Sequence, residues 1–231
     1  MNLFKTLACG LSLVAAVACG GGEAGCKKEC NGGGECATEC TTECTKNECM
    51  EKSECKKNAA IENIMSRRSI RNYKQEAVPR EVLDQIMECG INAPNAINRQ
   101  SWEVRIVENP ELQAQIKAAM AATGNERAEG CFYNAPVWVF IAQDSAFPFS
   151  AYDCGLMAEN MMLAANALGV GSVCLGSPVR FILDSPQKDA VLEKLGFSEG
   201  YELCLCISMG YPEGEKPEAK PRDMGKVKYV D

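Results

Sequence analysis

Residues 153–168 read DCGLMAENMMLAANAL, and the chain continues with Gly169-Val170-Gly171. Apolar side chains cover most of the circumference of the helix that this stretch predicts, so we expect the helix to be buried, either in the core or in a subunit interface. The glycine-rich segment ends it. Residues 136–142, PVWVFIA, form a continuous apolar run between turn residues, which predicts a central buried strand.

Shorter elements are predicted on both sides of these two. Residues 79–91 and 185–195 have apolar side chains at helical spacing, and another helix is expected after Asn109-Pro110, a typical helix start. Strands are expected at residues 104–107 and 203–208. The second strand alternates Leu203, Leu205 and Ile207 on one face with Cys204, Cys206 and Ser208 on the other. These elements indicate the α+β class.

Composition excludes several classes of function. The 231 residues carry a net charge of -7, which argues against nucleic acid or an anionic membrane surface as a partner, because either would be repelled. Histidine is absent, which excludes Ser-His-Asp and Cys-His catalysis and histidine-ligated zinc. The length suits one catalytic domain with an appendage.

The first 18 residues have the pattern of an export signal: Lys5, then an apolar run, then small residues before Cys19. The sequence Ala16-Val17-Ala18-Cys19-Gly20 resembles the lipobox of bacterial lipoproteins, in which the cysteine is acylated and becomes the first mature residue. This predicts an exported protein attached to a membrane through acylated Cys19. A plain secretory signal or a short apolar leader is the alternative, and a leader that does not function implies a cytoplasmic protein.

Residues 19–58 are rich in cysteine and glutamate and too poor in large apolar side chains to build a core. A spacer between anchor and enzyme is the simpler interpretation. Thiolates beside carboxylates also suit a soft or borderline cation, although the mostly CxxxC or longer spacing defines no metal geometry. The candidate metal ligands are Cys26, Cys30, Cys36, Cys40, Cys44, Cys49 and Cys55. Residues 59–231 then form the catalytic domain.

Three short clusters in that domain point to one ligand. Residues 67–73, RRSIRNY, and residues 220–222, KPR, carry five cations that suit a phosphate-sized anion, with Ser69 as an added hydroxyl donor. Residues 95–102, NAINRQSW, supply flat amide side chains that can read the donor and acceptor edge of a heterocycle. Each cluster alone is typical of a solvated surface. Together they predict a flavin mononucleotide (FMN) site.

The order and spacing of these clusters resemble the FMN-dependent nitroreductase family. Residues 152–172 are similar to the family's long central helix and the glycine turn after it, and residues 209–222 to its last strand and tail. The resemblance extends from about residue 61 to the end of the chain. It implies a three-layer fold with a central, mostly antiparallel sheet flanked by helices, in an obligate homodimer.

The resemblance also implies the roles of individual residues. The FMN phosphate would be held by Arg67, Arg68, Ser69, Lys220 and Arg222. Arg71 would tune the flavin from its N1 and O2 edge, and no side chain would act as catalytic acid or base, because the chemistry occurs at flavin N5. Further flavin contacts are implied for Pro94, Asn95, Asn98, Gln100, Leu175 and Gly176, with the loop of residues 95–101 reaching the partner's flavin. Ser101 stands where the family commonly has proline, which predicts a looser loop.

The implied reaction is an oxidation-reduction in which NAD(P)H, or another donor, and an electron-poor acceptor such as a nitroaromatic or quinone use one site in turn, a ping-pong mechanism. An exported enzyme has no ready NAD(P)H, so a membrane redox partner is the expected donor in that case. Two alternatives remain: a flavin enzyme of the same fold with other chemistry, such as reductive dehalogenation or flavin cleavage, and a cysteine-rich metal-binding lipoprotein without enzyme activity.

Overall fold

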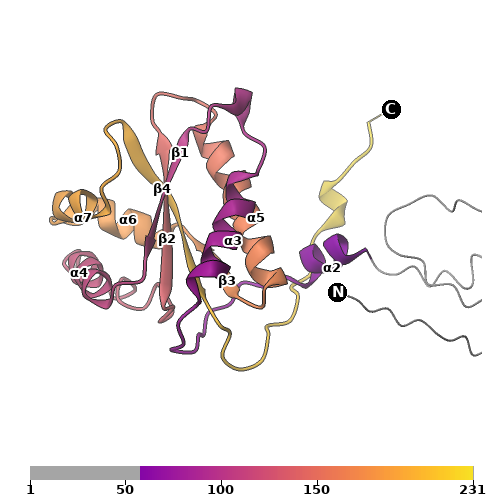
Figure 1. Ribbon diagram of the computed structural model, residues 1–231, viewed down its shortest axis with the longest axis horizontal. Coiled ribbons are helices and arrows are strands. Elements are labelled where there is room, and N and C mark those ends of the chain that lie inside the picture. Colours follow the sequence, from indigo (N-terminus) through magenta and orange to yellow (C-terminus); the bar gives the residue numbers. More distant parts are fainter. Residues whose placement is uncertain (1–57, 231) are drawn as a thin grey trace, which may run out of the picture. The chain divides into compact units, whose positions relative to one another are not determined.

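Four strands form a single sheet in the computed structural model, which describes residues 58–230. The sheet order is β1-β2-β4-β3, and every neighbouring pair is antiparallel (Figure 1). The strands are β1 (Trp102–Val107), β2 (Val137–Asp144), β3 (Gly171–Leu175) and β4 (Tyr201–Gly210). The predicted export signal, Cys19 and the cysteine-rich segment with its candidate metal ligands lie outside the described residues.

Helices cover both faces of the sheet and give three layers (Figure 1). One face carries α4 (Pro110–Ala121), α6 (Ser177–Leu183) and α7 (Lys188–Leu195), and the other carries α3 (Arg80–Ile91) and α5 (Ser150–Ala167). The short α2 (Ala59–Ser66) packs against α5, and two 3₁₀ turns occur at η1 (Ala96–Asn98) and η2 (Met224–Lys226). This arrangement confirms the predicted α+β class and the flanked antiparallel sheet. Among the described helices, none combines the length and the apolar character needed to cross a membrane.

Local sequence signals explain several of these elements. The Asn109 side-chain oxygen accepts a hydrogen bond of 2.9 Å from the Leu112 N–H, so the predicted Asn-Pro start of α4 is confirmed. Strand β2 is fully buried from Val137 to Ala142, as its apolar run predicted. Helices α3 and α5 approach closely because Gly90 has no side chain: a Cβ there would lie 2.5 Å from Cγ of Met161.

Helix α5 is buried on one side only. The side chains toward the sheet and α3 include Cys154, Met157 and Met161, each 1% exposed or less. On the opposite side Tyr152 is 70% exposed and Leu156 is 47% exposed. The helix predicted to be buried around most of its circumference therefore leaves an apolar surface uncovered within one chain.

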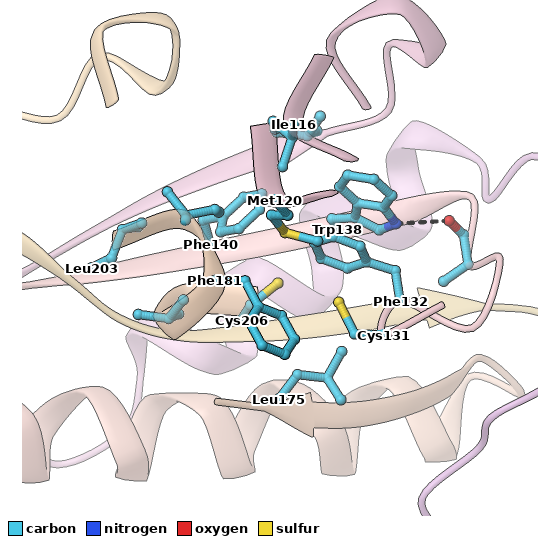
Figure 2. Packing of buried hydrophobic residues seen from close by; sticks show 14 of the residues in the cluster. Ile116, Met120, Cys131, Phe132, Trp138, Phe140, Leu175, Phe181, Leu203 and Cys206 are labelled. Atoms are coloured by element: carbon cyan, nitrogen blue, oxygen red, sulfur yellow. Dashed lines mark hydrogen bonds between the residues drawn. The ribbon is translucent and has the colours of Figure 1, made fainter. Parts of the chain in front are cut away.

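Aromatic packing dominates the core between the sheet and α4, α6 and α7 (Figure 2). The ring of Phe132 stacks on Trp138 with centroids 3.6 Å apart, and Phe140 meets Phe132 edge to face at 6.2 Å. The indole N–H of Trp138 donates to the carbonyl of Ala135 at 2.9 Å, so the buried polar atom is satisfied. These contacts join β2 to the segment that precedes it.

Strand β4 departs from the predicted simple alternation. Ile141 pairs with Leu205 but Ala142 pairs with Leu203, so Cys204 is an extra residue in a β-bulge. The bulge places Cys204 and Leu205 on the α5 face, whereas Leu203 packs with the opposite core. The prediction of Leu203, Leu205 and Ile207 on a common face is therefore wrong at Leu203.

Three elements were not predicted from the sequence. The predicted glycine turn ends at residue 172 and no element is predicted for residues 173–175, yet residues 171–175 form the edge strand β3. Residues 177–183 form α6, and the helix expected from residue 185 begins only at Lys188. Helix α2 begins after Asn58, whose side chain accepts from the N–H groups of Ala60 and Ile61.

Candidate functional site

The arginine-rich segment after α2 is fixed against the edge of the sheet. Ser69 forms a parallel bridge with Ser172 of β3, and the Ile70 N–H donates to the Ser172 carbonyl at 3.0 Å. The hydroxyl of Tyr73, 2% exposed, bonds to the carbonyls of Ile70 at 2.7 Å and Ser208 at 3.2 Å. Burial raises the pKa of the Tyr73 hydroxyl, which keeps it a neutral donor. These contacts explain why the segment lies beside β3.

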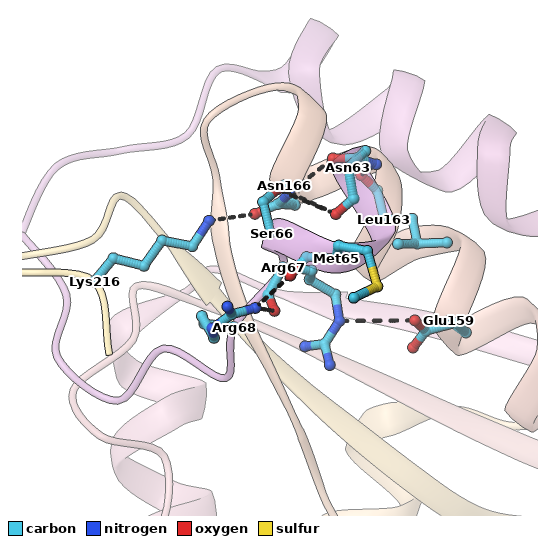
Figure 3. Close-up of polar contacts among 9 residues, drawn as sticks. All are labelled: Asn63, Met65, Ser66, Arg67, Arg68, Glu159, Leu163, Asn166 and Lys216. Carbon is cyan, nitrogen blue, oxygen red and sulfur yellow. Dashed lines mark hydrogen bonds and ion pairs between the residues drawn. The ribbon is translucent and has the colours of Figure 1, made fainter. Parts of the chain in front are cut away.

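Three cations line a cavity of about 180 Å³ at this edge, and Figure 3 shows how their side chains lie. Arg67 and Arg68 line it from the end of α2, and Lys216 reaches it from the segment after β4. The Nε atom of Arg67 lies 3.7 Å from Oε1 of Glu159 on α5, and the Lys216 ammonium donates to Oδ1 of Asn166 at 3.1 Å. The structure thus brings the two predicted arginines together at an anion-sized space.

The cavity also contains a buried hydroxyl group that has no hydrogen-bond partner among the described residues. Ser172 is 2% exposed and lines the same cavity, and within residues 58–230 its Oγ atom has no hydrogen-bond partner. Leaving a buried polar group without a partner costs about 1–3 kcal/mol. Gly171, next to it, is packed so closely on Ile70 that a Cβ would lie 2.8 Å from Cγ1 of that side chain. An anionic ligand with several acceptor oxygens would satisfy this hydroxyl.

The tail lysine that lines this cavity is not one of the two predicted tail cations. Lys220 and Arg222 are exposed and do not line it, whereas Lys216 does. Lys216 is exposed as well, and slight desolvation together with the charges of Arg68 and Arg67 lowers its pKa. Lys216-Pro217 and Lys220-Pro221 give two similar pairs four residues apart, so the sequence does not distinguish them. Ser172 was not predicted as a site residue, because a serine after a glycine turn is not a distinctive motif.

A second cavity, of about 430 Å³, lies near the other end of β3. Tyr133 and Ser177 line it, and Ser177 directly follows the predicted Leu175-Gly176 contact. The guanidinium of Arg71 lies 5.7 Å from the Tyr133 ring centroid, and its Nη1 is 3.4 Å from the Ser69 carbonyl. A Cβ at Gly176 would meet no heavy atom within 4 Å in the described structure. Arg71 and Gly176 do not line this cavity themselves, but each is next to a residue that does, Tyr133 and Ser177 respectively.

The amide-rich loop is strained and strongly anchored. Ile97, Asn98 and Gln100 have φ angles of 51°, 54° and 51°, in the left-handed region that side chains rarely adopt. Ser101 is 1% exposed, and its hydroxyl donates to Oδ2 of Asp153 on α5 at 3.2 Å. The other oxygen of Asp153 accepts from the Ala96 N–H at 3.0 Å. Ser101, which stands in place of the family's common proline, thus ties the loop to α5.

Replacing Asp153 with alanine should release this loop. The change removes both carboxylate contacts and leaves the Ala96 N–H and the Ser101 hydroxyl without partners, at an expected cost of about 2–4 kcal/mol. Limited proteolysis at Arg99 should become faster, while Ser101→Ala, which removes one contact only, should have a smaller effect. Equal cleavage of the wild type and Asp153→Ala would contradict the proposed anchor.

The loop and the cation cavity do not meet within one chain. Asp153 holds the loop at the start of α5, and Asn166 lines the cavity thirteen residues later on the same helix. At 1.5 Å of rise per residue this separation is about 20 Å. Pro94, Asn95, Asn98 and Gln100 therefore lie far from the cavity of their own chain, and the Asn95 side-chain oxygen accepts from the Gln100 N–H at 3.0 Å.

An antiparallel sheet between helical layers, with a cationic cavity at its edge strand, characterises this α+β domain. Residues 64–211 match the nitroreductase family. A putative NADH dehydrogenase/NAD(P)H nitroreductase of Archaeoglobus fulgidus is 31% identical over 161 residues, which are 68% of this chain and 87% of that protein. The chain belongs to the nitroreductase family, which confirms the predicted relationship and its class of oxidoreductase.

Solved structures agree with this assignment. A nitroreductase with bound FMN from Desulfitobacterium hafniense superposes with a TM-score of 0.69 and 30% identity, covering 75% of this chain and 99% of that one. A nitroreductase with bound FMN from Bacteroides fragilis gives a TM-score of 0.67 and 29% identity, covering 75% and 100%. The nitroreductase fold of residues 58–230 is thereby established.

Proposed function

We propose that this protein is an FMN-dependent oxidoreductase that takes electrons from NAD(P)H and passes them to an electron-poor acceptor such as a nitroaromatic or quinone. The observation that carries the proposal is the cavity that Arg67, Arg68 and Lys216 line together with Ser172, whose hydroxyl has no hydrogen-bond partner among the described residues. A phosphate monoester matches this site, because it carries nearly two negative charges and offers several acceptor oxygens. The family relationship supports the choice of FMN.

Residues near one end of β3 would bind the phosphate of FMN, and residues near its other end would contact the ring system. Arg67, Arg68, Lys216 and the hydroxyl of Ser172 would hold the phosphate, with Ser69 beside them. Arg71 and the backbone at Leu175 and Gly176 would face the ring system, where a cation favours the reduced anionic form. FMN, when bound, supplies hydride transfer between a donor and an acceptor that occupy the site in turn. No histidine or other catalytic acid or base is required by this scheme.

A homodimer would complete the site. The amides of Asn98 and Gln100 lie about 20 Å along α5 from the cation cavity of their own chain, so they would serve the flavin of the partner. Exposed apolar residues are consistent with a partner surface: Tyr152 on α5 is 70% exposed, and Tyr229 and Val230 in the C-terminal tail are each 95% exposed. Lys220 and Arg222 lie in the same exposed tail, which leaves a role across the dimer open to them.

Lys216 and Lys220 provide a matched pair of variants. Lys216→Gln should weaken FMN binding about fivefold at pH 7, as for a partly exposed charge contact of about 1 kcal/mol, and Lys220→Gln should weaken it less. Because the pKa of Lys216 is lowered, its positive charge, and with it its contribution to binding, is lost as pH rises at a lower pH than for an ordinary lysine. Fluorescence titration with FMN between pH 7 and 10 measures both effects. A larger loss with Lys220→Gln would contradict the assignment of Lys216.

The proposed function is tested by the visible spectrum of the full chain, loaded with FMN and kept anaerobic. Bleaching of the bound flavin by NADH or NADPH, followed by reoxidation with a quinone or nitroaromatic, is the expected result. A flavin that is reduced by dithionite but not by either nicotinamide would overturn NAD(P)H as donor and favour a membrane redox partner. Failure of the folded chain to retain FMN would overturn the site assignment.

A further inference from the structure

A thiol pair lies between α5 and the bulge of β4. Cys154 on α5 is completely buried, and its Sγ atom lies 3.7 Å from the carbonyl oxygen of Ala142, one of the residues opposite the bulge. Cys204 is the extra residue of the bulge and is partly accessible. Cys204 packs in the same cluster on the α5 side of the sheet as Cys154. A buried and an accessible cysteine therefore meet at a defined position.

The bulge is the reason that the two sulfurs meet. Regular alternation would send the side chain of residue 204 to the face opposite Leu205, whereas the extra residue turns both toward α5. Without the bulge, Cys204 would share the other core with Cys206, whose thiol is fully buried. The local irregularity thus creates the contact with Cys154.

The chemical environment of Cys204 differs from that of the neighbouring thiols. Burial raises the pKa values of Cys131, Cys174 and Cys206. The neighbouring Cys154 thiol lowers the pKa of Cys204, and the contact with Cys204 raises the pKa of Cys154, so the thiolate form is favoured at Cys204. The reactive form of a cysteine is the thiolate, so Cys204 is placed to attack and Cys154 to follow.

We infer that Cys204 and Cys154 are a redox-active thiol pair that exchanges with low-molecular-weight disulfides. The Cys204 thiolate attacks one sulfur of the small disulfide, forms a mixed disulfide and releases a small thiolate. Cys154 then loses its proton, attacks the Cys204 sulfur and displaces the second small thiolate, which leaves a Cys154–Cys204 disulfide. The two protein thiols are oxidised, the small disulfide is reduced to two thiols, and those thiols take up the two protons.

The test uses the reduced full chain, glutathione disulfide and trypsin without reductant. After quenching with N-ethylmaleimide, mass spectrometry should find residues 128–180 linked to residues 195–222, with fragment ions that assign the bond to Cys154 and Cys204. Cys154→Ser removes the second thiol and should trap glutathione on Cys204. Cys89, exposed on α3 and alone in the peptide of residues 81–99, is the internal reference thiol.

The expected rates give an independent readout. Cys204 should react with glutathione disulfide faster than Cys89 at pH 7, and Cys154→Ala should slow it. The slowing should be about threefold for each unit of rise in the Cys204 pKa, since thiolate fraction falls tenfold while nucleophilicity partly compensates. Cys174→Ser, which changes the neighbouring thiol of β3, should leave the linkage intact. Cys204 reacting no faster than Cys89, or linking to Cys174 instead, would overturn the inference.

Discussion

Replacing Arg67 with glutamine should weaken FMN binding by roughly 10- to 100-fold, the largest loss expected from a single residue of the cation cavity. Arg67 is half-buried at the cavity, and hydrogen bonds to charged groups are worth about 1.5–3 kcal/mol. Glutamine keeps most of the length of the side chain but loses its charge and its forked donors. Flavin fluorescence quenching during titration of the unliganded protein measures the dissociation constant.

Glu159→Gln is the matched control for this experiment. Glu159 is the ion-pair partner of Arg67, at 3.7 Å, and its side chain is 48% exposed. If Arg67 binds a phosphate, neutralising Glu159 removes a competing anion, so FMN affinity should stay the same or increase. If Arg67 serves only the ion pair, both variants should behave alike. A similar loss of affinity in the two variants would therefore refute the role given to Arg67.

Trp138→Ala should destabilise the folded domain by about 3–5 kcal/mol, the range for removing a buried aromatic side chain. Trp138 is 0% exposed, stacks on Phe132 and satisfies its indole N–H at Ala135, so the substitution empties a tightly packed site (Figure 2). Typical domains have only 5–15 kcal/mol of stability in total, so this loss is a large fraction. Urea unfolding followed by far-ultraviolet circular dichroism gives the change in free energy.

The second tryptophan of the chain supplies the control. Trp102 begins β1 and is only partly buried, so Trp102→Ala should cost less than Trp138→Ala. Trp138→Phe, which keeps an aromatic ring but loses the indole hydrogen bond, should fall between the wild type and Trp138→Ala. A loss of less than 1 kcal/mol for Trp138→Ala, with an unchanged slope in urea, would show that the core around Phe132 is not as tightly packed as described.

The sequence predicts best where one local signal dominates. The apolar run of residues 136–142 could only be a buried strand or a buried helix segment, and its short length favoured a strand. Asn109 could be assigned as a helix cap because its side chain satisfies an N–H three residues away, a purely local contact. The arginines at 67 and 68 were identified by their type, and the fold then brought them to one cavity.

The missed features depend on contacts that are distant in sequence. Strand β3 is short, and its formation depends on pairing with β4, more than 30 residues further along the chain. The bulge at Cys204 inserts one residue into a regular alternation, and the residue types in that strand do not predict its position. The choice between Lys216 and Lys220 depends on the position of Asn166, a third segment of the chain. Periodicity and local motifs contain none of this information.

Strand β3 sets the distance between the two cavities. Ser172 borders the cation cavity and Leu175 precedes the turn to the second cavity, so three residues, or about 10 Å of extended chain, set the spacing between them. A short anion such as inorganic phosphate would occupy the cation cavity without reaching the second cavity. Because side chains alternate with a period of two, inserting a single residue between Ser172 and Leu175 would increase the distance between the two cavities. It would also turn Ser172 away from the cations. In the proposed FMN site, the match to ligand length and the binding of the anion would thus both depend on one five-residue strand.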